Sequence, residues 1–126
     1  MKQPIDFMTQ LTEHIIWNVR LRCFLDGGAC INEDQAVSSE RCSLGQWLAR
    51  EGLSKYGHMA AINDLDAIHS QMHKQVKQII IAKNSGNAVE AEAGLIILHK
   101  ISERVIELLT ELDRNFDETK EERSLD

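Results

Sequence analysis

Apolar positions in this chain recur every three or four residues, which is the spacing of helices that bury one face. The first segment with this pattern covers residues 4–25, where Pro4 suits the first turn of a helix and Asp26-Gly27-Gly28 suits its end. Its apolar positions are Ile5, Met8, Leu11, Ile15, Val19 and Leu21. His14 shares a face with Trp17, Leu21 and Leu25. A histidine on such a face needs a partner in the core, because burying its nitrogens unpaired costs free energy.

The next part of the chain is predicted to contain two connections around one short helix. Residues 27–41 have the composition of a loop, with glycine, asparagine, aspartate and serine. A short helix is predicted from Cys42 to about Gly52, and its apolar residues would dock it on the other helices: Leu44, Trp47 and Leu48. Residues 53–57 are predicted to form the second connection.

Two long helices are predicted to follow, over about residues 58–83 and about residues 88–117, because apolar residues recur there at helical intervals. The sequence Asn84-Ser85-Gly86-Asn87 between them is typical of a turn. Residues 119–126 are charged and are expected to form a disordered tail. We therefore expect an all-α four-helix bundle as one domain over residues 1–118. It would consist of three long helices and a short Cys-bearing helix, with room for a fifth small helix.

Composition and charge narrow the class of protein. The 126 residues are 43% hydrophobic with a single proline, which suits a compact folded domain. A formal net charge of −6 argues against nucleic acid or an anionic membrane as partner. The sequence contains no apolar run of the ~20 residues that a membrane span needs, and its start lacks the apolar run of a secretion signal. We therefore expect a cytoplasmic protein, in which an odd number of cysteines, three, fits reduced thiols.

Four side chains with metal-binding atoms lie at spacings that helices can bring together: His14, Cys42, His69 and His73. His69 and His73 are four residues apart and therefore one turn apart on the same face of a helix. Three imidazole nitrogens and one sulfur form a favoured tetrahedral set for zinc. Four protein ligands leave no open position for a catalytic water, so a regulatory or structural site is expected and an enzyme is not.

In sequence order these residues form three short motifs: His14-x-x-Trp17, Cys42-x-Leu44-Gly45-x-Trp47 and His69-x-x-x-His73. Twenty-four residues separate the first motif from the second, and twenty-one separate the second from the third. In these motifs, their order and their intervals, the chain resembles the chemoreceptor zinc-binding family, or CZB domains.

The resemblance implies a helical bundle that binds one Zn²⁺ through His14, Cys42, His69 and His73, with Cys42 as the redox-sensing residue. It further implies regulation of chemoreceptor or diguanylate cyclase signalling domains in response to zinc or oxidants, and association as a homodimer. Trp17 and Trp47 are expected to shield the site from water. Asp66, one turn before His69, could accept a hydrogen bond from a ligand imidazole and fix its tautomer.

The remaining titratable residues of interest have ordinary interpretations. His58 is expected to be solvated, and His99 to be a core or interface histidine. Cys23 and Cys30 are expected to be buried, inert thiols, with a disulfide as the alternative.

Three other functions compete with a regulatory zinc module. A hemerythrin-like di-iron oxygen-binding bundle would need about five histidines and two bridging carboxylates, and His58 and His99 lack suitably placed companions. A Cys/His hydrolase would need a nucleophile turn, which the sequence does not contain. A purely structural zinc-stabilised interaction domain would use the same ligands and would differ from a sensor only in how readily the metal leaves.

Overall fold

A computed structural model describes residues 4–28 and 42–125, with side chains described as far as Phe116. All regular structure in these ranges is helical, which confirms the expected all-α bundle. The elements are α1 (Phe7–Leu25), α3 (Ser43–Trp47), a π-helical turn (Leu48–Gly52), α4 (Leu53–Tyr56), α5 (Ala60–Asn84) and α6 (Ala88–Leu125). The predicted loop over residues 27–41 lies outside the described residues from residue 29 onward.

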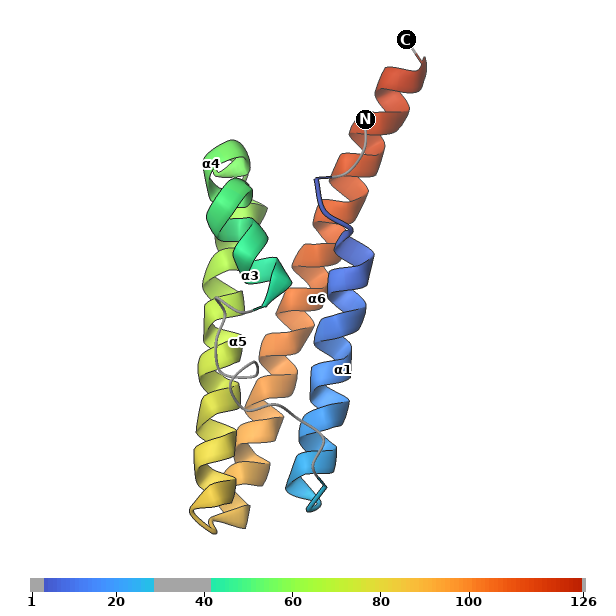
Figure 1. Ribbon diagram of the computed structural model, residues 1–126. Coiled ribbons are helices and arrows are strands. Elements are labelled where there is room, and N and C mark those ends of the chain that lie inside the picture. Colours follow the sequence, from blue (N-terminus) through green and yellow to red (C-terminus); the bar gives the residue numbers. More distant parts are fainter. Residues whose placement is uncertain (1–3, 29–41, 126) are drawn as a thin grey trace.

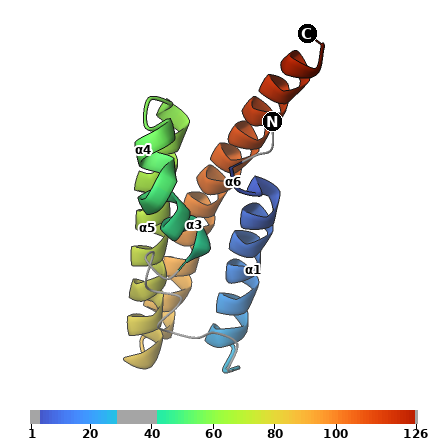
Figure 2. The same cartoon turned by 45° about the horizontal axis from the view of Figure 1, so that its top comes forward.

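The three long helices lie side by side, and the short helices cover one half of them (Figure 1). Helices α5 and α6 form an antiparallel hairpin. Helix α1 also runs antiparallel to α6 and packs against it. Turning the molecule shows α3 between α5 and α1, at the upper half of the bundle (Figure 2). Within the described ranges, none of the helices combines the length and the hydropathy needed to cross a membrane.

Helix α1 begins and ends with recognised capping signals. The Asp6 carboxylate accepts hydrogen bonds from the backbone N–H groups of Met8 and Thr9, so the helix begins at Phe7, three residues after the predicted start. At the other end Gly27 has a φ of 101°, and the Gly28 N–H donates to the Cys23 carbonyl at 2.9 Å. This is the left-handed glycine cap expected from the sequence, because residues with a Cβ rarely adopt that φ.

The buried face of α1 differs from the apolar positions in its sequence. Three of those positions are exposed, namely Met8, Ile15 and Val19. The buried residues are Phe7, Gln10, His14, Leu21 and Leu25. Two polar residues thus occupy core positions on α1, and simple hydrophobic spacing did not identify this face correctly.

The prediction of a connection over residues 53–57 was wrong, because the chain remains helical as far as Tyr56. A π-helical turn joins α3 to α4, and Gly52 within it keeps helical dihedral angles, φ −55° and ψ −54°. A Cβ on Gly52 would lie 3.0 Å from the Trp47 ring, so the absence of a side chain lets the indole lie across this turn. We refer to residues 42–56 as the Cys42 segment.

The predicted turn between the two long helices is confirmed. Gly86 has a φ of 79°, and the Asn87 N–H donates to the Ala82 carbonyl at 2.9 Å to close the end of α5. The Asn87 side chain then caps α6 by accepting a hydrogen bond from the Glu90 N–H at 3.1 Å.

Helix α6 continues to Leu125, beyond the predicted end at residue 117, and its last turns project past the other helices (Figure 1). Glutamate, lysine and arginine, which have high helix propensity, are frequent in the sequence over these turns. The predicted domain boundary at residue 118 falls within this helix and stays a prediction.

An aromatic cluster joins the Cys42 segment to the long helices, and it consists of Phe7, Trp47, Tyr56 and Phe116. The Trp47 ring contacts Phe7 edge-on at a centroid distance of 5.9 Å and stacks on Tyr56 at 6.2 Å. Phe116 of α6 lies 5.3 Å from Tyr56 and 5.5 Å from Phe7. Such ring pairs add about 0.5–1.5 kcal/mol each beyond their burial. This cluster therefore connects α3, α4, α1 and α6 in one apolar contact.

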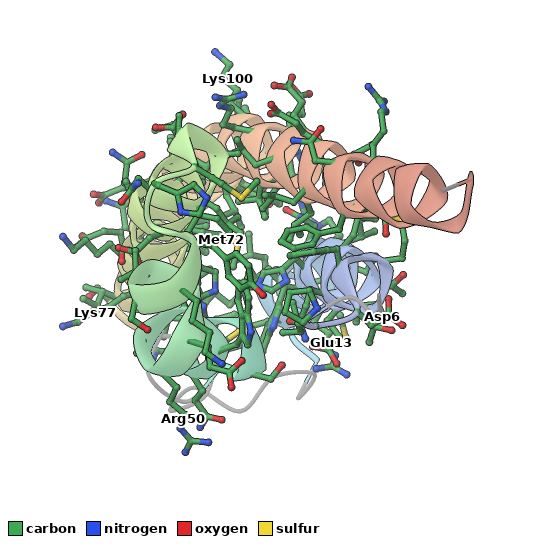
Figure 3. All side chains as sticks on the ribbon, turned by 90° about the horizontal axis from the view of Figure 1, so that it is seen from above. Asp6, Glu13, Arg50, Met72, Lys77 and Lys100 are labelled. Carbon is green, nitrogen blue, oxygen red and sulfur yellow. The ribbon has the colours of Figure 1, made fainter. Side chains whose placement is uncertain are left out.

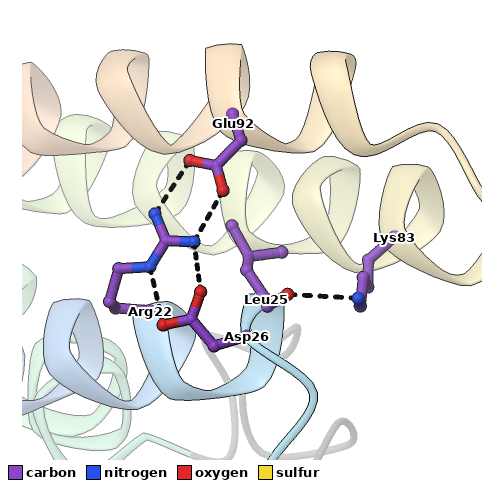
Figure 4. Close-up of polar contacts among 5 residues, drawn as sticks. All are labelled: Arg22, Leu25, Asp26, Lys83 and Glu92. Carbon is purple, nitrogen blue, oxygen red and sulfur yellow. Dashed lines mark hydrogen bonds and ion pairs between the residues drawn. The ribbon is translucent and has the colours of Figure 1, made fainter.

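At the opposite end of α1, polar contacts fix the pairing of the long helices (Figure 4). Arg22 forms ion pairs with Asp26 at 2.8 Å and with Glu92 of α6 at 2.6 Å. Lys83 of α5 donates to the Leu25 carbonyl at 3.1 Å. The side chains of both ion pairs are exposed, so each pair adds at most about 1 kcal/mol, and only the pair between Arg22 and Glu92 joins two helices.

Substitution of Gly86 tests the turn between α5 and α6. Gly86→Ala is expected to lower the free energy of unfolding by about 1 kcal/mol, because a Cβ is strained at this positive φ. The matched control is Ser85→Ala, since Ser85 has an ordinary φ of −85° and is exposed; its effect should stay below about 0.5 kcal/mol. Urea unfolding of the three proteins measures this difference, and equal losses for both variants would contradict it.

Candidate metal centre

The structure brings together all four of the residues singled out in the sequence. His14 comes from the middle of α1, Cys42 lies at the N-cap of α3, and His69 and His73 are one turn apart on α5. One potential ligand atom from each lies within 4.8 Å of the others. They form the single such group of three or more histidine, cysteine and acidic residues among the described residues.

A hydrogen bond fixes the tautomer of His14. Its Nδ1 lies 2.6 Å from the backbone carbonyl oxygen of Gln10. A carbonyl can only accept, so Nδ1 must carry the proton and Nε2 of the neutral ring keeps its lone pair. That Nε2 atom lies 3.6 Å from the Cys42 sulfur. His14 therefore presents its unprotonated nitrogen to the other candidate ligands.

The two α5 histidines face each other through equivalent nitrogens. Nε2 of His73 lies 3.1 Å from Nε2 of His69, and the ring planes are nearly perpendicular at 80°. Two such nitrogens can either share one proton or direct both lone pairs at one cation. The His14 ring lies edge-on to His69 at a centroid distance of 5.2 Å, on the same side of α5.

All three imidazoles are buried, and burial lowers the pKa of two of them. Their exposed fractions are 2% for His14, 1% for His69 and 3% for His73. Burial lowers the pKa of His14. Burial, together with the neighbouring His73 and His14, lowers the pKa of His69 to about 3. Both rings are therefore neutral at physiological pH, which is the form that binds metals.

Cys42 differs from the histidines because it is only half-buried. Its burial nevertheless raises the pKa of the thiol. A cation that takes this sulfur as a ligand must therefore displace its proton, since the thiolate is the metal-binding form.

These donors fit a single zinc ion. Zinc–nitrogen and zinc–sulfur bonds of about 2.0–2.3 Å place tetrahedral ligand atoms roughly 3.3–3.6 Å apart. The two measured donor separations, 3.1 Å between the α5 imidazoles and 3.6 Å between His14 and Cys42, are close to that spacing. Small shifts of the remaining atoms, all within 4.8 Å, would complete a tetrahedron.

Gln10 takes part in the site and was missed in the sequence. Its backbone carbonyl orients His14, and its side-chain Nε2 donates to the Ser43 hydroxyl at 3.0 Å, next to Cys42. Gln10 is buried, with 5% exposed. The sequence feature that could have identified Gln10 is its position four residues before His14, on the same face of the helix.

The three residues expected around the site lie in different surroundings. Trp47 is buried in the aromatic cluster, and its indole nitrogen has no hydrogen-bond partner among the described residues. Trp17 is half-buried, with the Arg20 guanidinium 5.4 Å above its ring. Asp66 is half-buried and lines a cleft together with His69, but the described hydrogen bonds include none between them. Their proposed roles around a bound metal stay predictions.

Two expectations for other residues need correction. His99 is exposed on the outer face of α6, so the core interpretation was wrong and the interface interpretation stays a prediction. Cys23 is half-buried and disulfide-bonded, so the expectation of reduced, inert thiols was wrong for this residue and the disulfide alternative is confirmed. Cys30 lies outside the described residues. Cys42 is a free cysteine and remains available as a ligand.

Comparison with known proteins agrees with the geometry. The family model described as the chemoreceptor zinc-binding domain matches residues 14–80, just over half of the chain. The matched range contains all four clustered side chains. No curated protein and no solved structure matches the chain.

The low pKa of His69 predicts acid sensitivity of the metal-free protein. The unfolded chain takes up a proton at this residue below about pH 6.5, whereas the folded protein does so only near pH 3. Between these values unfolding binds the extra proton, so stability falls as pH falls, by about 1.4 kcal/mol per pH unit for one such histidine. His69→Gln should reduce this pH dependence in the metal-free protein, while the lowered pKa of His14 maintains a part of it.

The matched control is His99→Gln, because His99 is exposed. Urea unfolding in chelator at several pH values between 7 and 4 measures the slopes. An unchanged slope in His69→Gln, or an equal change in both variants, would contradict the assignment.

Proposed function

The chain belongs to the chemoreceptor zinc-binding domain family, and on that premise we propose that it is a regulatory zinc-binding module. Its ligands would be Nε2 of His14, the Cys42 thiolate, and the facing Nε2 atoms of His69 and His73. The observation that supports this most strongly is the convergence of these four donors within 4.8 Å from three separate elements. A bound Zn²⁺ would supply a single positive centre that joins all four side chains.

The donor set favours this function over the alternatives. A di-iron oxygen carrier of the hemerythrin type requires bridging carboxylates, whereas the cluster of described residues has none and includes a thiol. Four protein ligands would leave no position for an activated water, which argues against a hydrolase and against enzymatic activity in general.

The position of Cys42 suggests how the module would respond. His14, His69 and His73 lie on long helices that are packed against α6 or one another. Cys42 lies at the start of the short Cys42 segment, and it is the most exposed of the four donors. Oxidation of its sulfur to sulfenic acid would weaken it as a ligand. We propose that loss of this bond loosens the Cys42 segment while the long helices stay packed.

The aromatic cluster offers a route for the output. Tyr56 at the end of the Cys42 segment contacts Phe116 of α6, and α6 projects beyond the bundle. A movement of the segment would therefore alter the packing of α6 where it leaves the bundle. We propose that α6 transmits the signal to a chemoreceptor or diguanylate cyclase signalling domain, within a cytoplasmic homodimer.

Bound-metal analysis tests the ligand set directly. The purified parent protein should contain about one Zn²⁺ per chain and be colourless. Cys42→Ala and His69→Ala should each weaken zinc binding more than about 100-fold, because losing a direct ligand costs more than losing a residue that orients one. His99→Ala, an exposed histidine outside the cluster, is the matched control. A metal-free parent that is unaffected by strong chelator would refute the proposal.

Hydrogen exchange tests the regulatory role. Removing the metal should make amide exchange within residues 43–56 about tenfold faster, a loss of about 1.4 kcal/mol of local stability, with little change within residues 72–82 of α5. Mild treatment with hypochlorous acid or peroxide should give the same local change if Cys42 is the oxidised residue. Equal exchange with and without zinc would exclude a switch. A loss of protection over the whole chain would instead support a purely structural zinc site.

A further inference from the structure

A cleft between the Cys42 segment and α5 leads to the candidate metal centre. It has a volume of about 360 Å³ and lies between Gly45, Gln46, Ala49 and Arg50 on one side and Asp66, His69 and Ser70 on the other. Seen from above, Arg50 points away from the bundle at its outer side, so the residue marks the open rim of the cleft (Figure 3).

The floor of the cleft is one of the four candidate ligands. His69 is 1% exposed yet lines the cleft, and its Nε2 lies 3.1 Å from that of His73. His14 and Cys42 do not line the cleft. A solute that enters between α3 and α5 therefore meets His69 before the other three candidate ligands.

The lining of the cleft suits a hydrated divalent cation. Asp66 lies three residues before His69 on the same face of α5, and it is half-buried. Ser70 and Gln46 add further oxygen donors, which hard hydrated cations accept in exchange for water. Arg50 opposes this charge, but it is exposed and its field is screened by solvent.

We propose that this cleft is the path by which Zn²⁺ enters and leaves the site, and that Asp66 is the first, transient ligand on that path. This inference rests on the proposed function. Asp66 is not among the four residues whose donor atoms converge, so it takes no place in the final ligand set. A cation held by its carboxylate passes to His69, one turn further along the helix, and then to the other three donors.

A residue on the path affects rates, whereas a residue that orients a ligand affects the equilibrium. A higher barrier slows entry and exit by the same factor and leaves the dissociation constant unchanged, because neither end state is altered. A hydrogen bond from His69 to Asp66 would instead alter the bound state and shift the dissociation constant. The two roles of Asp66 are therefore separable by measurement.

Two variants of the full chain test the path. Ala49→Phe fills the cleft from an exposed position, and Asp66→Asn removes the charge while keeping the shape. The matched control for added bulk is Ala93→Phe, since Ala93 is also exposed and lines a second cleft of about 220 Å³ between α5 and α6. Circular dichroism and melting temperature establish that each variant is folded before kinetics are measured.

Stopped-flow mixing of metal-free protein with Zn²⁺ gives the association rate, and competition with a chromophoric chelator gives the dissociation rate and the dissociation constant. Asp66→Asn is expected to slow association by about tenfold, with a matching fall in dissociation. Ala49→Phe should slow both steps by one common factor, and Ala93→Phe should alter neither.

The proposed path would be overturned if Ala49→Phe and Asp66→Asn both bound and released Zn²⁺ as fast as the parent protein. A shifted dissociation constant in Asp66→Asn with parental association would overturn the capture role and identify Asp66 as a residue that orients His69. Failure of the parent to bind zinc would refute the proposed function itself, which is a separate outcome.

Discussion

The structure depends on how it accommodates three imidazoles and a thiol in an otherwise apolar core. Each buried nitrogen would destabilise the fold if it were left charged or unpaired. The protein meets this constraint by lowering the pKa values of His14 and His69, so that both rings are neutral, and by using the Gln10 carbonyl as the partner of His14 Nδ1. The candidate ligand atoms of the three histidines and Cys42 then lie within 4.8 Å of one another, where a single cation would bind all of them.

Local signals in the sequence predicted much of this fold. The glycine and asparagine turn between α5 and α6 and the glycine end of α1 are local features, and both lie where the sequence places them. Four-residue spacing alone puts His69 and His73 on one face of α5. The spacing of the other two motifs also anticipated the approach of His14 and Cys42, because distant residues with matching chemistry must meet if they share one function.

What could not be predicted depends on packing between distant elements. The inner face of α1 contains Gln10 beside the expected His14, because that face meets the polar cluster rather than a uniform core. Periodicity of apolar residues cannot reveal such a face. The π-helical turn is similar, since Gly52 permits either a connection or a helix, and the Trp47 ring across it favours the helix.

With a metal bound as proposed, two kinds of contact would hold the Cys42 segment, and they would respond differently to pH and oxidants. Aromatic and aliphatic burial around Trp47 depends little on pH or oxidants. A bond from Cys42 to a metal would depend on both, through the raised pKa of the thiol and its chemistry as a reduced sulfur. Losing only the bond to the metal would leave the segment attached but less constrained.

The indole N–H of Trp47 has no hydrogen-bond partner among the described residues, and within them its ring is held by contacts with the Phe7 and Tyr56 rings. Because Tyr56 and Phe116 link this segment to α6, a change of only a few kcal/mol at one sulfur can reach the helix that leaves the bundle. In the proposed switch, the contact between Tyr56 and Phe116 would carry a movement of the Cys42 segment to α6 through side-chain packing.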